Sequence, residues 1–340
     1  MRFSTAPVKS YGGRSARESY GRRSLDEFEL IRRFFDRPSV DDSVKLSVGD
    51  DGAVLRPADG RELVMVVDTL VENTHFTADL EARDIGYRAV AVNLSDMAAM
   101  GARPRWMTLA LTLDNADENW LHEFAAGLFE AADKFGVSLV GGDTTRGATK
   151  VISIQVVGDS MPGKTIARSG AAPGDAIFVS GTIGDAAAGL AQMLGKDENP
   201  SGSGFLKRRF SRPTPRLSLG QALVDTASAA IDVSDGLYSD IVKLLARSDM
   251  GGTLVIDAIP LSEELQSLGR DTALRFALGG GDDYELCFTA SPGDQASIAG
   301  ISGNLGLPIT RIGSIHDGKQ LNCTLHGAAF DFADAGFRHF

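Results

Sequence analysis

The sequence predicts a two-domain protein of the mixed α/β or α+β class. Its 340 residues suit two ordinary domains. In both halves, short apolar runs typical of strands alternate with longer segments of helical spacing. Residues 163–174, rich in small residues, Gly and Pro, separate the halves. We therefore expect an N-terminal domain over residues 24–162 and a C-terminal domain over residues 163–340.

The N-terminal half begins with an amphipathic segment and then alternates strands and helices. We expect helices over residues 25–35, 84–100 and 118–135, the last ended by Gly136. We expect strands over residues 63–67, 106–113, 138–140 and 151–157. The first of these strands ends just before Asp68, so we expect that acid at a strand end.

The C-terminal half shows the same mixture of elements, with no fixed-period repeat. We expect strands over residues 176–179, 229–232, 253–256, 284–289 and 309–315. We expect helices over residues 184–194, 216–226, 237–247 and 272–278, and a polar loop over residues 196–204. Strands and helices in one domain favour a layered α/β arrangement.

Composition excludes several classes of protein. The net charge is −11, which argues against a general nucleic-acid binder and suits a protein that collects cations. No segment approaches the roughly 18 consecutive apolar residues of a membrane helix, so no membrane association is expected. The two cysteines, Cys287 and Cys323, do not suggest a disulfide framework. We therefore expect a reducing compartment, the cytoplasm.

Residues 1–23 differ from the rest, with many Arg, Ser and Gly residues and one acid, Glu18. That composition is also found in organelle transit peptides. No amphipathic apolar face is evident, so we interpret this stretch as a disordered tail or an over-extended start, with the transit peptide as the alternative.

Aspartates recur beside glycines or at the ends of expected strands. They are Asp50, Asp51, Asp68, Asp143, Asp232, Asp235, Asp282 and Asp283. Strand ends in α/β folds line the ligand crevice, where gathered carboxylates repel each other unless cations neutralise them. Mg²⁺ prefers such ligands and bridges them to phosphates, as phosphoryl transfer requires. Asp beside Gly is also ordinary turn chemistry, which explains one motif more easily than all of them together.

Asp96 belongs to a different pattern. Ala89, Val92, Asp96 and Ala99 fall on one face of the helix expected over residues 84–100, and that face is otherwise apolar. An acid on such a face is either buried and paired or directed at a site, unless the helix turns it to solvent. We favour the site.

Residues 158–165 match the phosphate-binding pattern G-x-x-x-x-G-K-[ST]. The pattern works only when a helix begins at the lysine, here Lys164. Gly170, Pro173 and Gly174 would end any such helix within about two turns, so we interpret the match as coincidence. Residues 181–185 could begin an anion-binding helix or form a plain turn and cap.

Seven motifs in this order resemble those of the thiamine-monophosphate kinases, a family in the aminoimidazole ribonucleotide synthetase superfamily. The motifs are Gly49-Asp-Asp-Gly, Val67-Asp-Thr-Leu-Val-Glu-Asn-Thr-His-Phe, Ala91-Val-Asn-Leu-Ser-Asp-Met, Gly141-Gly-Asp-Thr-Thr-Arg-Gly, Ala167-Arg-Ser-Gly-Ala, Ala230-Ile-Asp-Val-Ser-Asp-Gly-Leu and Gly280-Gly-Asp-Asp-Tyr-Glu-Leu. The resemblance runs from about Asp26 to the C-terminus.

The resemblance implies transfer of the γ-phosphate of ATP onto thiamine monophosphate with several Mg²⁺ ions. It also implies a homodimer in which the N-terminal domains form a shared β-barrel, each packed on a C-terminal α/β domain. By correspondence, Mg²⁺ would be held by Asp51, Asp68, Asp96, Asp143, Asp232 and Asp235. ATP would contact Gly142, Asp143, Arg168 and Ser234, and the thiamine phosphate would contact His75, Asp282 and a C-terminal aromatic, for which Phe337 is preferred over Phe332.

This chain departs from the family pattern at two internal sites. Val66 and Val67 stand where the family has Ser or Thr, so any metal contact there would come from backbone carbonyls. Asp282 stands where the family often has Glu, which shortens that side chain by one methylene.

Rival interpretations have specific weaknesses. A selenophosphate synthetase would need an N-terminal Cys, and the hydrogenase maturation factor would need a Cys-bearing tail, whereas the chain has no Cys before Cys287 and ends in Arg-His-Phe. An aminoimidazole ribonucleotide synthetase fits the motif at residues 282–285 less well. A non-catalytic nucleotide sensor and a P-loop enzyme are alternatives from other classes.

Overall fold

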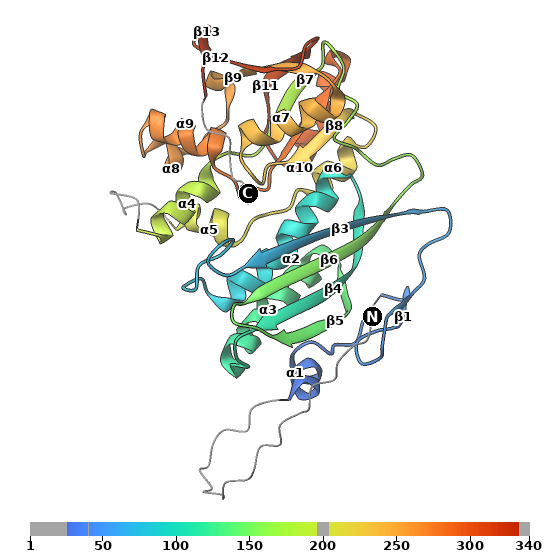
Figure 1. Ribbon diagram of the computed structural model, residues 1–340. Helices are drawn as coiled ribbons and strands as arrows, with labels where there is room; N and C mark the ends of the chain where they lie inside the picture. Colours follow the sequence, from blue (N-terminus) through green and yellow to red (C-terminus); the bar gives the residue numbers. More distant parts are fainter. Residues whose placement is uncertain (1–25, 40, 196–203, 333–340) are drawn as a thin grey trace, which may run out of the picture.

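The computed structural model describes residues 26–39, 41–195 and 204–332, which form two domains stacked one above the other (Figure 1). The N-terminal tail, most of the loop expected over residues 196–204, and Phe337 lie outside the described residues. Within the described part, no helix is both long and apolar enough to cross a membrane.

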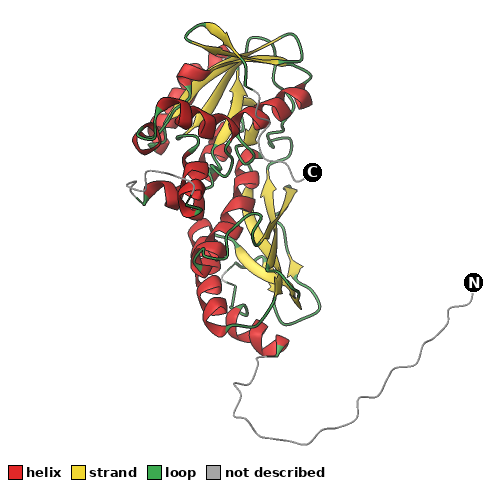
Figure 2. Ribbon diagram, turned by 60° about the vertical axis from the view of Figure 1, so that its left-hand side comes forward, coloured by secondary structure: helices red, strands yellow, loops and turns green. Residues whose placement is uncertain are grey.

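The N-terminal domain is built on a four-stranded sheet. Its strands, in spatial order, are β3 (Glu62–Val71), β6 (Val151–Ser160), β4 (Arg103–Leu113) and β5 (Ser138–Arg146). Only the β4–β5 pair is parallel. The long helices α2 (Ala82–Ala99) and α3 (Glu118–Phe135) lie on one face of this sheet, and its other face is open (Figure 2). β3 and β5 are the edges, so the described strands form an open sheet.

Helices α2 and α3 pack closely because glycines stand where they cross. A Cβ atom on Gly86 would lie 2.1 Å from the Phe124 carbonyl oxygen, and one on Gly127 would lie 1.8 Å from that of Arg83. Any side chain at either position would therefore force the helices apart. Helix α3 begins at the Asp117 cap and ends at Gly136, which has φ 70°, as its sequence predicts.

The chain before β3 forms a small peripheral layer. It contains α1 (Glu27–Phe34), β1 (Val44–Leu46) and β2 (Val54–Leu55). Helix α1 packs against α3 through an edge-to-face contact between Phe35 and Phe124. The Ser43 hydroxyl accepts a hydrogen bond of 2.9 Å from the Trp106 indole.

The C-terminal domain contains a seven-stranded mixed sheet. The strands in spatial order are β13 (Ala328–Phe330), β12 (Leu321–Leu325), β9 (Gly251–Val255), β11 (Ile309–His316), β7 (Ala176–Ser180), β10 (Leu286–Ala290) and β8 (Ala227–Asp232). The helices are α4 (Asp185–Met193), α5 (Phe205–Ser211), α6 (Leu217–Leu223), α7 (Leu237–Ser248), α8 (Glu263–Gln266), α9 (Arg270–Gly279) and α10 (Gln295–Leu305), with short 3₁₀ turns at Ile256–Ala258 and Pro292–Asp294. The expectation of a mixed two-domain fold is confirmed.

Several strands are longer than their sequence predicts, and β3 and β5 matter most because their extensions carry predicted site acids. β3 continues past residue 67 to Val71, so Asp68 lies within a strand and not at its end. β5 continues through Asp143 to Arg146 because its glycines pair with β4, where a Cβ on Gly142 would lie 1.9 Å from the Leu109 carbonyl oxygen. Pairing with a neighbouring strand therefore overrides a local pattern that favours turns.

Short peripheral elements were not expected from the sequence. They are β1, β2, α5, α8, α10, β12 and β13. The P-loop match is a coincidence in structural terms too, because β6 is followed by turns over residues 161–175. There, Lys164 forms an exposed ion pair with Asp225.

Candidate active site between the two domains

A cavity of about 1260 Å³ opens where the two domains meet. The N-terminal domain contributes residues of β3, the turn after it and α2, whereas the C-terminal domain contributes the end of β8, helices α4 and α9, and the loop before β10. The polar lining residues are Asp68, Thr69, Thr74, His75, Asp96, Arg168, Asp232, Ser234, Asp235, Asp282 and Tyr284. Most of the residues that the sequence predicts for the site are therefore gathered here.

The cavity acids of the N-terminal domain are set by a contact between β3 and α2. The backbone N–H of Asp68 donates to Oδ1 of the buried Asn93, at 2.9 Å. The amide of Asn93 in turn donates to the carbonyl of Ala89 in the preceding turn. Asp96 lies on the next turn of α2 and lines the same cavity. The Asp96 position thus matches the site interpretation of its helix face.

The acids of the C-terminal domain are placed by a buried carboxylate behind them. Asp232 ends β8, and the loop after it carries Ser234 and Asp235. Oδ2 of Asp240, on α7, accepts the backbone N–H groups of both Ser234 and Asp235, each at 3.0 Å. Asp240 is 1% exposed, so this loop is anchored from the protein interior.

Burial and mutual repulsion oppose ionisation of these acids. Burial raises the pKa of Asp96 to about 6, with a further contribution from the Asp68 charge. Burial raises the pKa of Asp232 well above its ordinary value, and the charge of Asp96 adds to it. The pKa of Asp68 is also raised, by burial and then by Asp235. The predicted repulsion between gathered carboxylates is therefore present.

Cationic side chains offset part of this charge. Arg168 lines the cavity and lowers the pKa of Asp96 against the effect of burial. Lys243 forms ion pairs with both Asp235 and Asp240 behind the loop. The arginine stands where a phosphate group could pair with it in a two-point contact.

One wall of the cavity is largely apolar. It is formed by Leu190 and Leu194 near α4, Phe276 on α9, and Leu70 and Val71 on β3. His75 lies at the edge of this wall, and its Nδ1 accepts the backbone N–H of Val71 at 3.0 Å. Such a surface suits a flat, partly apolar ligand.

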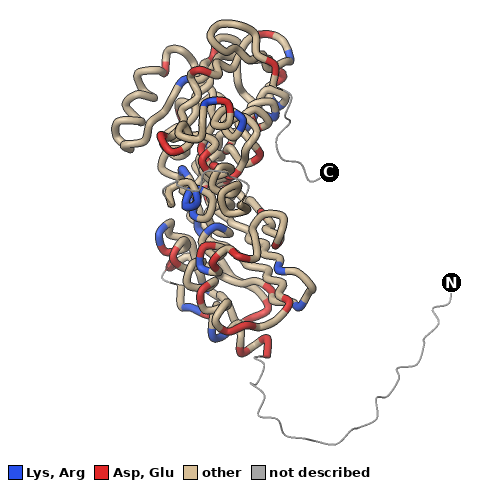
Figure 3. Tube along the Cα trace, turned by 90° about the vertical axis from the view of Figure 1, so that its left-hand side faces the viewer, with Lys and Arg blue, Asp and Glu red and all other residues tan. Residues whose placement is uncertain are grey.

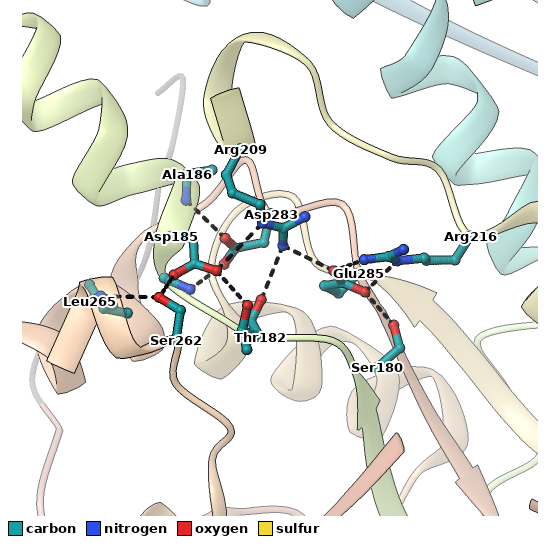
Figure 4. A network of polar contacts seen from close by, with 11 residues as sticks. Ser180, Thr182, Asp185, Ala186, Arg209, Arg216, Ser262, Leu265, Asp283 and Glu285 are labelled. Atoms are coloured by element: carbon teal, nitrogen blue, oxygen red, sulfur yellow. Dashed lines mark hydrogen bonds and ion pairs between the residues drawn. The ribbon is translucent and has the colours of Figure 1, made fainter. Parts of the chain in front are cut away.

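The loop before β10 presents alternate side chains to opposite sides. Asp282 and Tyr284 line the cavity, while Asp283 and Glu285 are fully buried. Asp283 accepts the backbone N–H groups of Gly184 and Ala186 and so caps α4 (Figure 4). The negative charge at the N-terminus of α4 is therefore supplied by the Asp283 carboxylate. This agrees with the interpretation of residues 181–185 as a turn and cap. Asp283, which the sequence grouped with the site acids, lies behind the cavity.

Glu285 completes the network behind the loop. Its carboxylate pairs with Arg209 and Arg216 and accepts the Ser180 hydroxyl at 2.6 Å (Figure 4). Arg209 lies on α5 and Arg216 lies just before α6. Figure 3 shows a group of Lys and Arg positions near the level where the domains meet. The network fixes the loop from behind and leaves its other side to the cavity.

The remaining predicted acids lie in a second, smaller cavity. Asp51, Gly142 and Asp143 line a space of about 320 Å³ between α1, the turn before β2 and β5. Val66 and Val67 lie on β3, and the Val67 side chain is 60% exposed on the open sheet face. The six predicted metal-binding aspartates thus fall into a group of four and a group of two.

No three Asp, Glu, His or Cys side chains come close enough to form a metal cluster among residues 26–39, 41–195 and 204–332. The donor set nevertheless fits Mg²⁺, which keeps several waters and commonly binds one or two carboxylates together with substrate phosphates. Repelling, buried carboxylates would be relieved by such an ion.

Sequence patterns missed four residues that shape the site: Arg88, Asn93, Asp240 and Tyr284. Asn93 and Asp240 accept backbone N–H groups of other segments, and a sequence pattern does not reveal such tertiary contacts. Arg88 lies on α2 two turns before Asp96, and a cation within the apolar middle of that helix is the available signal.

The class of protein follows from family models that match both domains. The family described as AIR synthase related protein, N-terminal domain, matches residues 49–159, and its C-terminal domain counterpart matches residues 172–326. Solved structures of the hydrogenase maturation protein HypE, at 22% identity and a TM-score of 0.72, share this fold.

The particular family follows from nearly full-length relatives. The thiamine-monophosphate kinase of Haemophilus influenzae is 44% identical over 332 residues, covering 93% of this chain and 98% of the relative. That of Bacillus subtilis is 35% identical, covering 86% and 92%. The crystal structure of thiamine-monophosphate kinase from Stenotrophomonas maltophilia K279a superposes with a TM-score of 0.81 at 44% identity, covering 90% and 98%. The chain belongs to the thiamine-monophosphate kinase family.

One further structure bears on ligands. AaThiL complexed with AMPPCP and TMP matches this chain with a TM-score of 0.74 at 30% identity, covering 95% of this chain and all of that one. The relative thus holds an ATP analogue and TMP on the same fold.

Proposed function

We propose that this chain is an ATP-dependent kinase that phosphorylates thiamine monophosphate to thiamine diphosphate. The observation that carries the proposal is the cavity between the domains, where carboxylates, Arg168 and an apolar wall meet. The family relationship and the relative bound to AMPPCP and TMP support the same substrates. In the reaction, the γ-phosphorus of ATP forms a bond to a phosphate oxygen of thiamine monophosphate and its bond to the β-phosphate oxygen breaks, releasing ADP.

The chain's own residues position the two phosphate groups. Arg168 and Ser234 face the nucleotide phosphates, and the apolar wall with His75 and Asp282 takes the thiamine phosphate. The acceptor is already an anionic oxygen, so the chain need supply no strong general base and no covalent intermediate. Alignment of the two groups in line carries the rate.

Magnesium ions belong to this proposal. Asp68, Asp96, Asp232 and Asp235 would hold them in the larger cavity, and Asp51 and Asp143 in the smaller one. Backbone carbonyls of Val66 and Val67, on β3 beside Asp68, would be further contacts. Bound Mg²⁺ would neutralise charge on the phosphate oxygens. Nucleotide phosphates would supply the remaining ligands, since the described part of the chain brings no ready cluster of three donors.

The proposal is tested by mixing the purified protein with ATP, Mg²⁺ and thiamine monophosphate and separating the products by chromatography. Free thiamine and aminoimidazole ribonucleotide precursors serve as parallel acceptors. Equal amounts of ADP and thiamine diphosphate, dependent on Mg²⁺, are expected. Turnover with another acceptor would move the substrate elsewhere in the superfamily, and tight nucleotide binding without turnover would favour a sensor.

We also propose that two copies pair through the open sheet face and together form a β-barrel. Three large apolar side chains of β3 point out of this face: Leu63, Met65 and Val67, each more than half exposed. A row of this kind on a strand at the sheet edge is typical of an interface. Light scattering is expected to show a dimer for the natural chain and a monomer for Met65→Glu. A monomeric natural chain would refute this part.

We further propose where the two domains divide and in which cellular compartment the protein works. β6 ends at Ser160 and β7 begins at Ala176, which supports a boundary near residues 162 and 163. Both cysteines are buried and free, which supports a reducing compartment such as the cytoplasm.

A further inference from the structure

Arg88 is a buried cation that no part of the proposed reaction uses. It lies on α2, in the N-terminal domain, and its side chain is 1% exposed. Burying a guanidinium is costly unless its donors are satisfied. Yet its Nε atom is buried without a hydrogen-bond partner among the described residues. The side chain is therefore not optimised for stability alone.

The hydrogen bond, ion pair and ring contacts that the described residues make with the Arg88 side chain cross to the C-terminal domain. One guanidinium nitrogen, Nη2, forms an ion pair with Oδ1 of Asp282, and the other, Nη1, donates to the carbonyl of Phe210 at 2.6 Å. The guanidinium carbon lies 4.2 Å from the ring centre of Phe210 and 5.5 Å from that of Tyr284. Arg88 thus reaches both loop residues that line the cavity.

Those two loop residues are held in an unusual backbone conformation. Asp282 has φ 69° and Tyr284 has φ 52°, values that non-glycine residues seldom adopt and that persist only when the surroundings fix them. The backbone N–H of Asp282 donates to the Ser234 carbonyl at 2.9 Å, which ties the loop to the predicted nucleotide contact. The Tyr284 hydroxyl also donates to Oδ1 of Asp282, at 3.2 Å. Both contacts therefore use one oxygen of Asp282.

We propose that Arg88 is a positioning residue for the phosphate acceptor. It holds Oδ1 of Asp282 across the domain boundary, so that Oδ2 stays available to the ligand and the left-handed turn stays against the cavity. Because the anchor belongs to one domain and the anchored loop to the other, the acceptor wall takes its shape only when the two domains are docked. This inference deepens the proposed function and rests on it.

The experiment compares Arg88→Met and Arg88→Lys with Arg83→Gln in the full-length chain. Arg83 is a matched control because it lies on the same helix, pairs with Glu130 on α3 and lies outside the cavity lining. Steady-state kinetics gives KM for thiamine monophosphate and for ATP, and calorimetry gives the affinity for thiamine monophosphate alone. Thermal unfolding is followed in parallel, since a general structural loss would lower Tm and change both KM values together.

Arg88→Met is expected to raise KM and Kd for thiamine monophosphate about tenfold or more, the scale of one charge-assisted hydrogen bond. KM for ATP should stay within about twofold. Arg88→Lys keeps the charge but loses the planar guanidinium group. Its KM and Kd for thiamine monophosphate should therefore lie between those of the natural chain and those of Arg88→Met. If Arg88→Met does not fold, the lysine variant carries the same comparison.

A double-mutant cycle with Asp282→Asn shows whether Arg88 acts through Asp282. The double variant should bind thiamine monophosphate no more weakly than Asp282→Asn alone, because both substitutions remove the same interaction between Arg88 and Asp282. Additive losses, unchanged acceptor binding, or equal changes in both KM values would overturn the role of Arg88. Failure of the natural chain to bind and phosphorylate thiamine monophosphate would instead overturn the proposed function, and this inference with it.

Discussion

The two cavities of this molecule carry the same kind of residue in different surroundings. The larger one joins elements of both domains, and its acids are partly or fully buried beside one another. The smaller one lies within the N-terminal domain, and its Asp51 and Asp143 are exposed. Gathered, buried acids repel each other unless a cation neutralises them, whereas exposed acids keep their contact with water. We therefore expect the acids of the larger cavity to depend more strongly on a bound cation than Asp51 and Asp143 do.

The largest expected effect is at Asp232, the most deeply placed of the cavity acids. Asp232→Asn removes a charge that would hold Mg²⁺ against the phosphates, so turnover should fall by roughly 10³-fold. The metal-free variant should be at least as stable as the natural chain, because a repelling buried acid is gone. Activity assays and thermal unfolding check both parts, with the exposed Asp249→Asn as control. Near-normal turnover would remove the larger cavity from the reaction.

Asp143→Asn and Asp51→Asn test whether the smaller cavity belongs to the same reaction. Each should lower turnover by roughly 10²-fold, through loss of a metal contact at the phosphates. Because both acids are exposed, the Tm of the metal-free protein should scarcely move. Activity close to that of the natural chain, with normal folding, would show that the larger cavity works alone and would break the link between them.

The stability of the metal-free protein should depend on pH through the larger cavity. Asp96 has a pKa of about 6 in the fold against an ordinary 3.8, so folding favours its protonated form. The resulting stabilisation is complete below pH 3.8 and is lost as the pH rises toward 6. In a chelating buffer, Tm should therefore fall by several degrees across the upper part of this range, and Asp96→Asn should flatten the change. An unchanged profile in that variant would assign the effect to other acids.

The smallest expected effect is at Lys164, which lies in neither cavity lining. Its ion pair with Asp225 is exposed on both sides, so Lys164→Ala should change stability by less than about 1 kcal/mol. kcat/KM should stay within about twofold. A collapse of ATP turnover in a folded variant would restore the P-loop interpretation.

Much of the architecture can be predicted from local patterns. Helix α3 carries clear apolar spacing and is ended by Gly136 where expected, whereas α2 is buried on nearly all sides. The ends of strands are harder to predict. β3 and β5 continue through Asp68 and Asp143 because they pair with neighbouring strands that local sequence does not reveal. Short elements such as α5 owe their place to tertiary contacts.

The candidate site could be predicted for residues that stand in motifs. The helix face of Asp96 predicts that it is directed at a site, and Asp96 lines the larger cavity. The division of the acids between two cavities depends on the relative placement of distant segments, which no motif encodes. Asp282 and Asp283 are neighbours of one residue type, yet one faces the cavity and the other caps α4. Only the backbone conformation at Asp282 separates their roles.

The alternation along residues 282–285 has a consequence for how this loop can vary in length. Adding or removing one residue would exchange the two sets of side chains, sending the cap of α4 and the partner of Arg209 into the cavity. Both the helix start and the acceptor wall would be lost in one event. We therefore expect the length of this loop to be fixed, because a single insertion or deletion would disturb both of its sides.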